Sequence, residues 1–147
     1  MDLDKFKVVN DTCGHTAGDE MLRQLSFVLN NAVRHHDTLA RLGGDEFGVL
    51  MEHCSLDDAR RVASSLQKAV QDYQFSWEGH SFRVSVSIGL VPIPETTPNL
   101  TELLQYADAA CYMAKDKGRN RIHVYHTEDS EIAQRYGEMK WVTRLIQ

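Results

Sequence analysis

The sequence predicts an α+β fold in which helices flank a central, mainly antiparallel sheet. Strand-like and helix-like segments follow one another in the order strand, helix, hairpin, helix, hairpin, helix, strand. The helical segments carry apolar side chains on one face, and short glycine-containing turns join the paired strands. A chain of 147 residues is long enough for one domain with a core and short for two. Helices packed on a single sheet fit this order best.

The chain starts with the end of a strand, followed by a helix. Residues 1–4 read as the last residues of a buried strand, and such strands normally have about five residues. We therefore expect the earlier part of this strand to precede Met1 in a longer protein. The helix is expected over residues 18–33, where apolar side chains recur at helical spacing, with Thr16 as its N-cap.

Two hairpins and a helix form the middle of the predicted fold. Gly43 and Gly44 can adopt the positive φ of a tight hairpin turn, and Gly79 lies in the second turn. Ser55 precedes Asp58 by three residues, which is the spacing of a helix N-cap. The expected ranges are 38–42 with 47–51 for the first hairpin, 55–73 for the helix and 75–77 with 82–91 for the second hairpin.

A third helix, a last strand and a tail complete the chain. Asn99 and Glu102 predict the start of the helix, and Gly118 is a typical residue just past a helix end. A short strand is expected over 121–125. The residues expected on the buried face of the helix are Leu103, Leu104, Ala107, Ala110 and Ala114.

Composition and charge exclude several classes of protein. A net charge of −5 leaves no basic surface for a nucleic acid. Cys13, Cys54 and Cys111 are odd in number and lack CxxC spacing, which indicates reduced thiols in a cytosol-like compartment. No run of residues approaches a membrane span. We expect a cytoplasmic location and no membrane contact by this fragment, although a longer protein could be membrane-anchored.

Acidic residues lie at the ends of two predicted strands. Asp45 and Glu46 follow the glycines of the first hairpin, and adjacent acids at such a tip repel each other unless a cation offsets the cost. Asp2 and Asp4 point to one face of the first strand because side chains alternate along a strand. If that strand lies beside the hairpin, the converging oxygens suit Mg²⁺. The alternative is a set of solvated acids.

Further polar residues lie near these acids in the sequence. Asn10 offers a donor and an acceptor, and Asp19 can accept two N–H bonds, so together they could read a guanine edge. The alternatives are a turn asparagine and a charge in the first turn of a helix. Lys115 and Arg119 flank the end of the third helix. Taken alone, they would be cations that complement the helix dipole.

Five segments together resemble the GGDEF domains, the diguanylate cyclases. The match runs in the right order from residue 2 to about residue 125, and its departures, such as Cys13 where an aromatic residue is common, lie outside the chemistry. The matching segments are 2–19 (DLDKFKVVNDTCGHTAGD), 41–47 (RLGGDEF), 86–89 (VSIG), 107–115 (ADAACYMAK) and 118–120 (GRN).

The resemblance implies a palm-like fold related to class III nucleotide cyclases, and an Mg²⁺- or Mn²⁺-dependent diguanylate cyclase. Such an enzyme condenses two GTP molecules into cyclic di-GMP and releases pyrophosphate. By position, Asp2 and Asp45 resemble the metal ligands, together with the Leu3 carbonyl and Glu46. Asp45 or Glu46 would assist deprotonation of the attacking hydroxyl, and the sequence does not decide between them.

The resemblance also assigns the substrate contacts. Asn10 and Asp19 resemble the guanine readers, and the two glycines of the hairpin make room for the phosphates. Phe6, Lys7, Lys115 and Arg119 resemble the walls and cations around the phosphates. Because one domain holds one GTP, two domains must face each other across a two-fold axis, so a homodimer is expected.

Arg34 and Asp37 form an RxxD motif just before the first hairpin. By itself this motif indicates an exposed charged turn. At this offset the family resemblance implies an inhibitory site for the product cyclic di-GMP, in which Arg34 grips a phosphate or guanine edge and Asp37 a guanine. His35 and His36 are adjacent and share no helical face, so we do not expect them to bind a metal.

The tail divides the chain into residues 1–126, the GGDEF domain, and 127–147, an amphipathic helical segment. A helix that packs back on the domain is one interpretation. We favour a connector, because 129–141 resembles the segment that leads into an EAL domain in composite proteins. The alternative function follows from it: a weakly active or inactive GTP-binding domain that regulates a downstream EAL cyclic di-GMP phosphodiesterase.

Overall fold

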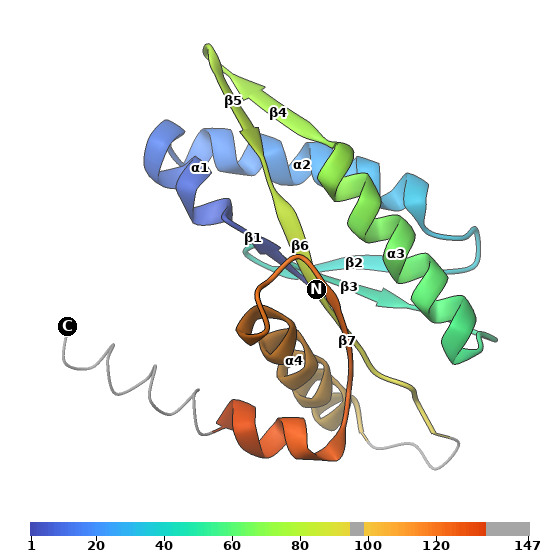
Figure 1. The fold of residues 1–147 in the computed structure, drawn as a ribbon. Coiled ribbons are helices and arrows are strands. Elements are labelled where there is room, and N and C mark those ends of the chain that lie inside the picture. The colour runs from blue at the N-terminus through green and yellow to red at the C-terminus, as the bar shows by residue number, and fades with distance from the viewer. Residues whose placement is uncertain (95–98, 135–147) are drawn as a thin grey trace.

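A computed structural model describes residues 1–94 and 99–134 of the chain (Figure 1). The predicted order of strands, helices and hairpins is confirmed, with one additional helix after the first strand. The elements are β1 (Asp2–Asp4), α1 (Phe6–Cys13), α2 (His15–Ala32), β2 (Thr38–Gly43), β3 (Glu46–Leu50), α3 (Leu56–Asp72), β4 (Gln74–Trp77), β5 (His80–Arg83), β6 (Ser85–Leu90), α4 (Leu100–Asp116) and β7 (Ile122–Val124).

The central sheet has the strand order β2-β3-β1-β6-β7 within the described part of the chain. Its neighbouring strands are antiparallel except for β6 and β7, which are parallel. The predicted α+β class with a mainly antiparallel sheet is therefore confirmed. Strand β1 lies in the middle of this sheet, so residues at its ends face both the β2–β3 hairpin and strand β6.

The two faces of the sheet differ in what covers them. Leu3, Val86 and Ile88 belong to the main core cluster together with apolar residues of α2 and α3. Gly89 faces α4 so closely that an added Cβ would lie 2.5 Å from the Cys111 backbone nitrogen. Helices α2 and α3 therefore cover one face and α4 covers the other (Figure 1). Because side chains alternate, Asp2 lies on the α4 face of β1.

Helix α1 was not predicted, and the start of the next helix was predicted too late. Of the residues of α1 only Val9 is buried, so no apolar stripe marks this short helix, and its β-branched valines have low helix propensity. Helix α2 begins at His15 after Gly14 (φ +90°), so the expected N-cap Thr16 is wrong. The glycine breaks the chain between the two helices.

The capping predictions for the other two long helices are confirmed. Ser55 Oγ accepts a hydrogen bond from the Asp58 backbone N–H at 3.1 Å, and Asn99 Oδ1 accepts one from Glu102 at 2.9 Å. The buried face of α4 is partly wrong, because Leu104 is 41% exposed. The residues of α4 that are buried against the sheet are Ala109, Ala110, Cys111 and Ala114.

The expected second hairpin is divided between two sheets. Strands β4 and β5 pair with each other in a separate two-stranded sheet, and the chain then passes through Val84 into β6 of the central sheet. The single arm expected over 82–91 is therefore two strands. Its alternation survives the break, because Val84, Val86, Ile88 and Leu90 are all buried.

The start of the tail is helical over residues 127–134, as expected. The rest of the predicted connector, residues 135–147, lies outside the described residues, so neither interpretation of it is tested. In the described part of the chain, no helix combines the length and the apolar character that a membrane crossing requires.

Candidate active site

The sheet register brings the predicted acidic residues together. Asp2 of β1 lies opposite Glu46 of β3, and the Leu3 backbone N–H donates to the Asp45 carbonyl at 3.2 Å. Asp45 occupies the hairpin turn directly after Gly44. The structure therefore places the acids of the hairpin beside Asp2. The sequence alone did not show whether the first strand lies next to the hairpin.

The two hairpin acids, Asp45 and Glu46, ionise less readily than ordinary carboxyl groups. Burial raises the pKa of Asp45, and the neighbouring Asp2 charge raises it further. Burial and the Asp2 charge likewise raise the pKa of Glu46. A raised pKa means that the ionised form is disfavoured in the folded protein. Burial and the repulsion by Asp2 therefore outweigh the nearby positive charges of Lys115 and the Met1 ammonium.

Lys115 of α4 provides a partial counterion. Its Nζ donates to Asp2 Oδ2 at 2.7 Å, and both side chains are mostly buried. Burial alone would lower the pKa of Lys115, but the hydrogen bond and the charge of Asp2 outweigh it and raise the pKa. Lys115 is thus held as a cation that points into the acidic cluster rather than one that only caps α4.

Asp108 is a further acid of this cluster that sequence reasoning missed. It lies on α4 two turns before Lys115, and burial followed by the charge of Asp2 raises its pKa. A spacing of seven residues places two side chains on one helix face. The seven-residue spacing between Asp108 and Lys115 is the sequence signal from which Asp108 could have been predicted.

Oxygen ligands and excess negative charge fit a hard divalent cation such as Mg²⁺. In the described residues no group of three or more His, Cys, Asp or Glu side chains is already arranged to hold a metal ion, and one Asp2 oxygen is occupied by Lys115. The chemistry of the donors therefore fits the metal, while the side chains would have to turn toward it. Asp2, Glu46 and Asp108 also border a cavity of about 570 Å³ whose remaining lining is largely apolar.

The junction of α1 and α2 contains a buried, unpartnered polar atom. Asn10 Oδ1 is buried and has no hydrogen-bond partner. Gly18 makes room for it, because a Cβ at this position would lie 1.8 Å from Asn10 Oδ1 and 3.1 Å from the Phe6 ring. Asp19 follows on α2 and is exposed. A buried acceptor without a partner is costly and indicates a missing donor.

The turn between β1 and α1 and the tip of the β2–β3 hairpin both lie next to the acids in the chain. Lys5 has a left-handed backbone (φ +66°), after which Phe6 is half-buried and Lys7 exposed. At the hairpin, a Cβ on Gly43 or Gly44 would meet nothing within 4 Å. The glycines therefore border open space, as a phosphate-bearing ligand would require.

Asp4 does not join the acidic cluster of Asp2, Asp45 and Glu46. It is 1% exposed and accepts hydrogen bonds from the hydroxyls of Ser85 and Ser87, each at 2.7 Å, and from the Asn120 backbone N–H at 3.0 Å. Arg119 Nη1 lies 3.9 Å from Asp4 Oδ1 while the arginine side chain stays 55% exposed. The two aspartates of β1 therefore have separate surroundings.

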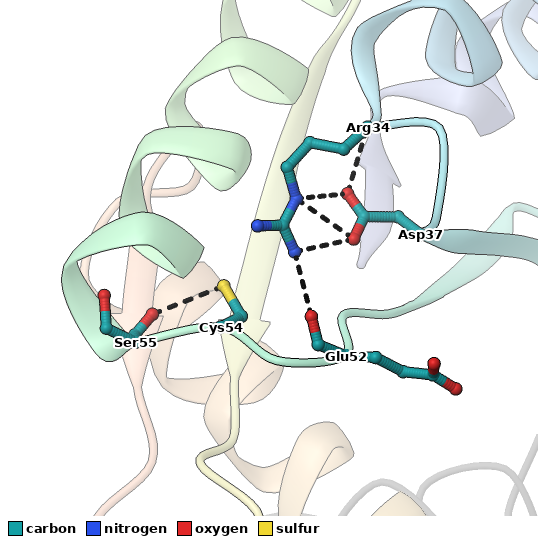
Figure 2. Close-up of polar contacts among 5 residues, drawn as sticks. All are labelled: Arg34, Asp37, Glu52, Cys54 and Ser55. Atoms are coloured by element: carbon teal, nitrogen blue, oxygen red, sulfur yellow. Dashed lines mark hydrogen bonds and ion pairs between the residues drawn. The ribbon is translucent and has the colours of Figure 1, made fainter.

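Arg34 and Asp37 form a closed pair at the start of β2 (Figure 2). The guanidinium donates to both carboxylate oxygens, at 2.8 Å from Nη2 and 3.0 Å from Nε, and the Arg34 backbone N–H donates to Oδ2 at 2.9 Å. Nη2 also reaches the Glu52 carbonyl at 3.5 Å. The hydrogen bonds from Arg34 lower the pKa of Asp37, and those to Asp37 raise the pKa of Arg34.

Comparison with known proteins yields matches along most of the chain. Residues 1–121 match the family model described as diguanylate cyclase, GGDEF domain. The "Probable diguanylate cyclase DgcE" of Escherichia coli K12 is 45% identical over 130 residues, which are 88% of this chain and 12% of that protein.

Two further matches extend the comparison. The "Bifunctional diguanylate cyclase/cyclic di-GMP phosphodiesterase MucR" of Pseudomonas aeruginosa is 47% identical over 91% of this chain and 19% of its own length. A solved structure comprising only the GGDEF domain of PA1120 (TpbB or YfiN) from Pseudomonas aeruginosa has a TM-score of 0.81 and 36% identity, over 90% of this chain and 78% of that one. The chain thus spans less than a fifth of each of these two curated relatives.

Proposed function

The chain belongs to the GGDEF family of diguanylate cyclases, and from this membership we propose that it condenses two GTP molecules into cyclic di-GMP. In each of the two steps a 3′-hydroxyl attacks the α-phosphorus of the other nucleotide, a P–O bond forms, and pyrophosphate leaves. The observation that carries the proposal is the cluster of Asp2, Asp45 and Glu46, in which the pairing of two strands brings acids together and ionisation of the two hairpin acids is disfavoured.

The family is generally dependent on a divalent metal, and we propose that the cluster holds Mg²⁺ or Mn²⁺. Asp2, Asp45 and Glu46 would bind the ion together with the Leu3 carbonyl. When bound, such an ion neutralises charge on the reacting phosphate and lowers the pKa of an attacking oxygen. Lys115, held beside Asp2, would move from the carboxylate toward a phosphate oxygen once the cation takes its place.

The proton of the attacking hydroxyl would pass to Asp45 or Glu46. Both carboxylates have raised pKa values, which makes them better proton acceptors than ordinary carboxylates. Glu46 pairs with Asp2 in the sheet and Asp45 lies in the turn, so the two acids approach the ligand from different backbone positions. This difference supports one acid acting mainly on the metal and the other on the proton.

The base would be read between α1 and α2. Guanine offers N1–H and N2–H₂ donors, and Asn10 Oδ1 is a buried acceptor that lacks one. Asp19 on the adjacent helix would accept from the same edge. Phe6, which packs against Gly18, would form a wall of this pocket, while Lys7 and Arg119 would meet the phosphates.

Two copies must cooperate, because one domain binds one GTP and the reaction joins two. We propose a homodimer in which the two acidic clusters face each other across a two-fold axis. The reaction is therefore expected to depend on protein concentration.

Product inhibition is proposed for the Arg34–Asp37 pair. A guanidinium with a bidentate carboxylate partner offers the geometry that phosphates and guanine edges also bind. In this structure the two side chains satisfy each other, so cyclic di-GMP would have to replace their mutual bonds.

A second candidate function is a GTP-binding regulator of a linked EAL phosphodiesterase. It is favoured by the similarity to MucR, whose name carries both activities, and by the helical segment that follows β7. In that case residues 127–147 would transmit the GTP-bound state to the next domain.

The deciding experiment is incubation of the full-length protein with GTP and Mg²⁺ or Mn²⁺, followed by chromatography. Cyclic di-GMP and pyrophosphate should appear at a rate that rises more than linearly with protein concentration. Absence of product at high protein concentration, together with GTP-stimulated hydrolysis of cyclic di-GMP, would contradict the cyclase and favour the regulator.

A further inference from the structure

The turn between α4 and β7 has an unfavourable backbone conformation. Gly118, Arg119 and Asn120 all have positive φ angles, of +122°, +63° and +48°. Residues with a Cβ rarely adopt this region, and such a backbone persists where its surroundings hold it in place. The turn carries Arg119, so whatever holds it also sets the direction of that side chain.

Asp4 holds the turn from the side of the sheet. Its carboxylate is buried in the middle strand, and Oδ2 accepts the Asn120 backbone N–H at 3.0 Å. The hydroxyls of Ser85 and Ser87 fix the same carboxylate at 2.7 Å each. Bonds of this kind to a charged acceptor are stronger than those between neutral groups.

Helix α3 holds the turn from the opposite side. Gln67 Nε2 donates to the Asn120 carbonyl at 2.7 Å, and Gln71 Nε2 donates to Asn120 Oδ1 at 2.8 Å. The backbone N–H, the backbone carbonyl and the side chain of Asn120 are therefore all engaged. The Arg119 side chain, in contrast, remains more than half exposed.

We propose that Asp4 is a positioning residue, whose carboxylate fixes the Gly118–Asn120 turn and thereby directs Arg119 at the triphosphate of GTP. The identity of the ligand rests on the proposed function, whereas the fixing of the turn rests on the hydrogen bonds alone. Asp4 is buried among these protein donors and is not one of the residues that we propose to contact the nucleotide or the metal. Its charge also attracts the guanidinium, whose Nη1 lies 3.9 Å from Asp4 Oδ1.

The test compares Asp4→Asn with the double variant Gln67→Ala/Gln71→Ala. The asparagine has the shape of the aspartate but brings an NH₂ group among three donors, and the backbone N–H of Asn120 cannot turn away. Amide hydrogen exchange of the segment that contains Asn120 should become faster in both variants. Affinity for GTP should fall about tenfold, as expected for the loss of a hydrogen bond to a charged group, while affinity for guanosine stays unchanged.

Gln105→Ala, which truncates an exposed glutamine of α4, is the matched control. It should change neither the amide exchange at Asn120 nor the affinity for GTP. Unchanged exchange at Asn120 in Asp4→Asn would overturn the inference whether or not the protein turns over GTP. Equal losses of GTP and guanosine affinity would also overturn it, because they indicate a general structural role. If Asp4→Asn does not fold, Ser85→Ala decides, because it removes a hydroxyl that fixes Asp4 Oδ2: exchange at Asn120 should again become faster, and unchanged exchange would overturn the inference. Failure of the wild-type protein to bind GTP would instead contradict the proposed function, and the exchange data would still report on the turn.

Discussion

The acidic cluster and the Arg34–Asp37 pair use the same types of side chain in opposite states. At the cluster, Lys115 is paired with Asp2 and the Met1 ammonium lies near Glu46, yet burial and mutual repulsion still raise the pKa of the two hairpin acids. At the RxxD motif one cation meets one anion, and the pKa of Asp37 is lowered by Arg34. One site is short of positive charge, whereas the other is balanced.

The difference predicts how each site responds to a ligand. A cation that enters the acidic cluster removes a repulsion that already destabilises the folded protein, so binding and stability increase together. A ligand at Arg34 and Asp37 must first replace good hydrogen bonds, so its affinity is reduced by the cost of opening the pair. The first site is prepared for its ligand, and the second is closed in its absence.

The largest effect is expected from Asp45→Asn. Loss of this charge should reduce cyclic di-GMP synthesis by about 100-fold or more, because an electrostatic contact to the reacting phosphate is removed. The same variant should be more stable than the wild type without metal, since a repelled carboxylate is gone. Initial rates and thermal unfolding in EDTA measure the two effects. A variant that is both less active and less stable would mean that Asp45 supports the hairpin rather than the metal.

Gly18→Ala tests whether the unpartnered Asn10, like the acidic cluster, lacks a partner that the ligand supplies. The added methyl group would collide with Asn10 Oδ1, so this side chain must move out of the α1–α2 junction. We expect the affinity for GTP to fall about tenfold while the affinity for ATP changes little, so that base discrimination is lost. Gly79→Ala controls for a general effect of losing a glycine: unlike the helical Gly18, Gly79 lies in the β4–β5 turn with a φ of +84°, and a Cβ there would meet nothing within 4 Å. Retained preference for GTP would contradict the guanine-reading role.

Arg34→Ala tests the balanced site. Without the guanidinium, inhibition by cyclic di-GMP should weaken about tenfold, while synthesis at low product concentration is retained. The buried Asp37 loses its main partner, so stability should fall and the pKa of Asp37 should rise from its lowered value. Titration with added product measures the first effect. The matched control is Arg23→Ala, which breaks an exposed pair with Glu20. If cyclic di-GMP inhibits wild type and variant equally, Arg34 and Asp37 only stabilise the loop and do not form the inhibitory site.

The smallest effect is a shift in melting temperature, whose dependence on pH should differ between the acidic cluster and the Arg34–Asp37 pair. The pKa values of Asp45 and Glu46 are raised on folding, so their ionisation reduces stability as the pH rises from the ordinary carboxyl pKa through the folded value. Above that window the cost is fully present, and saturating Mg²⁺ should raise the melting temperature by about 5 °C at pH 7 and much less at pH 4. Asp37 behaves oppositely, because its lowered pKa gives stability that is lost as the pH falls. An Mg²⁺ effect that is equal at both pH values would contradict the assignment of the cluster.

The sequence was sufficient for the α+β class and for most elements, and it named Asp2, Asp45 and Glu46, which the sheet register brings together. Apolar periodicity predicted α3, because this helix buries one continuous face, and Ser55 marked its start. The same reasoning missed α1, which buries one residue, and treated residues 82–91 as one strand, so it missed the break at Val84. Periodicity detects elements that pack through their own side chains. It does not detect short elements that the surrounding structure holds in place.

What the sequence by itself determined is therefore local: which residues are acidic, which can cap or turn, and which family they resemble. Only the tertiary structure decided how those residues are used. Asp2 and Asp4 have the same chemistry and lie on the same face of β1, yet the register of β1 sets Asp2 against Glu46 and Asp4 against Ser85. One carboxylate thus joins the acidic cluster and the other is buried under the Arg119 turn. Charge and burial act through space, so these roles depend on contacts between residues that are distant in the chain.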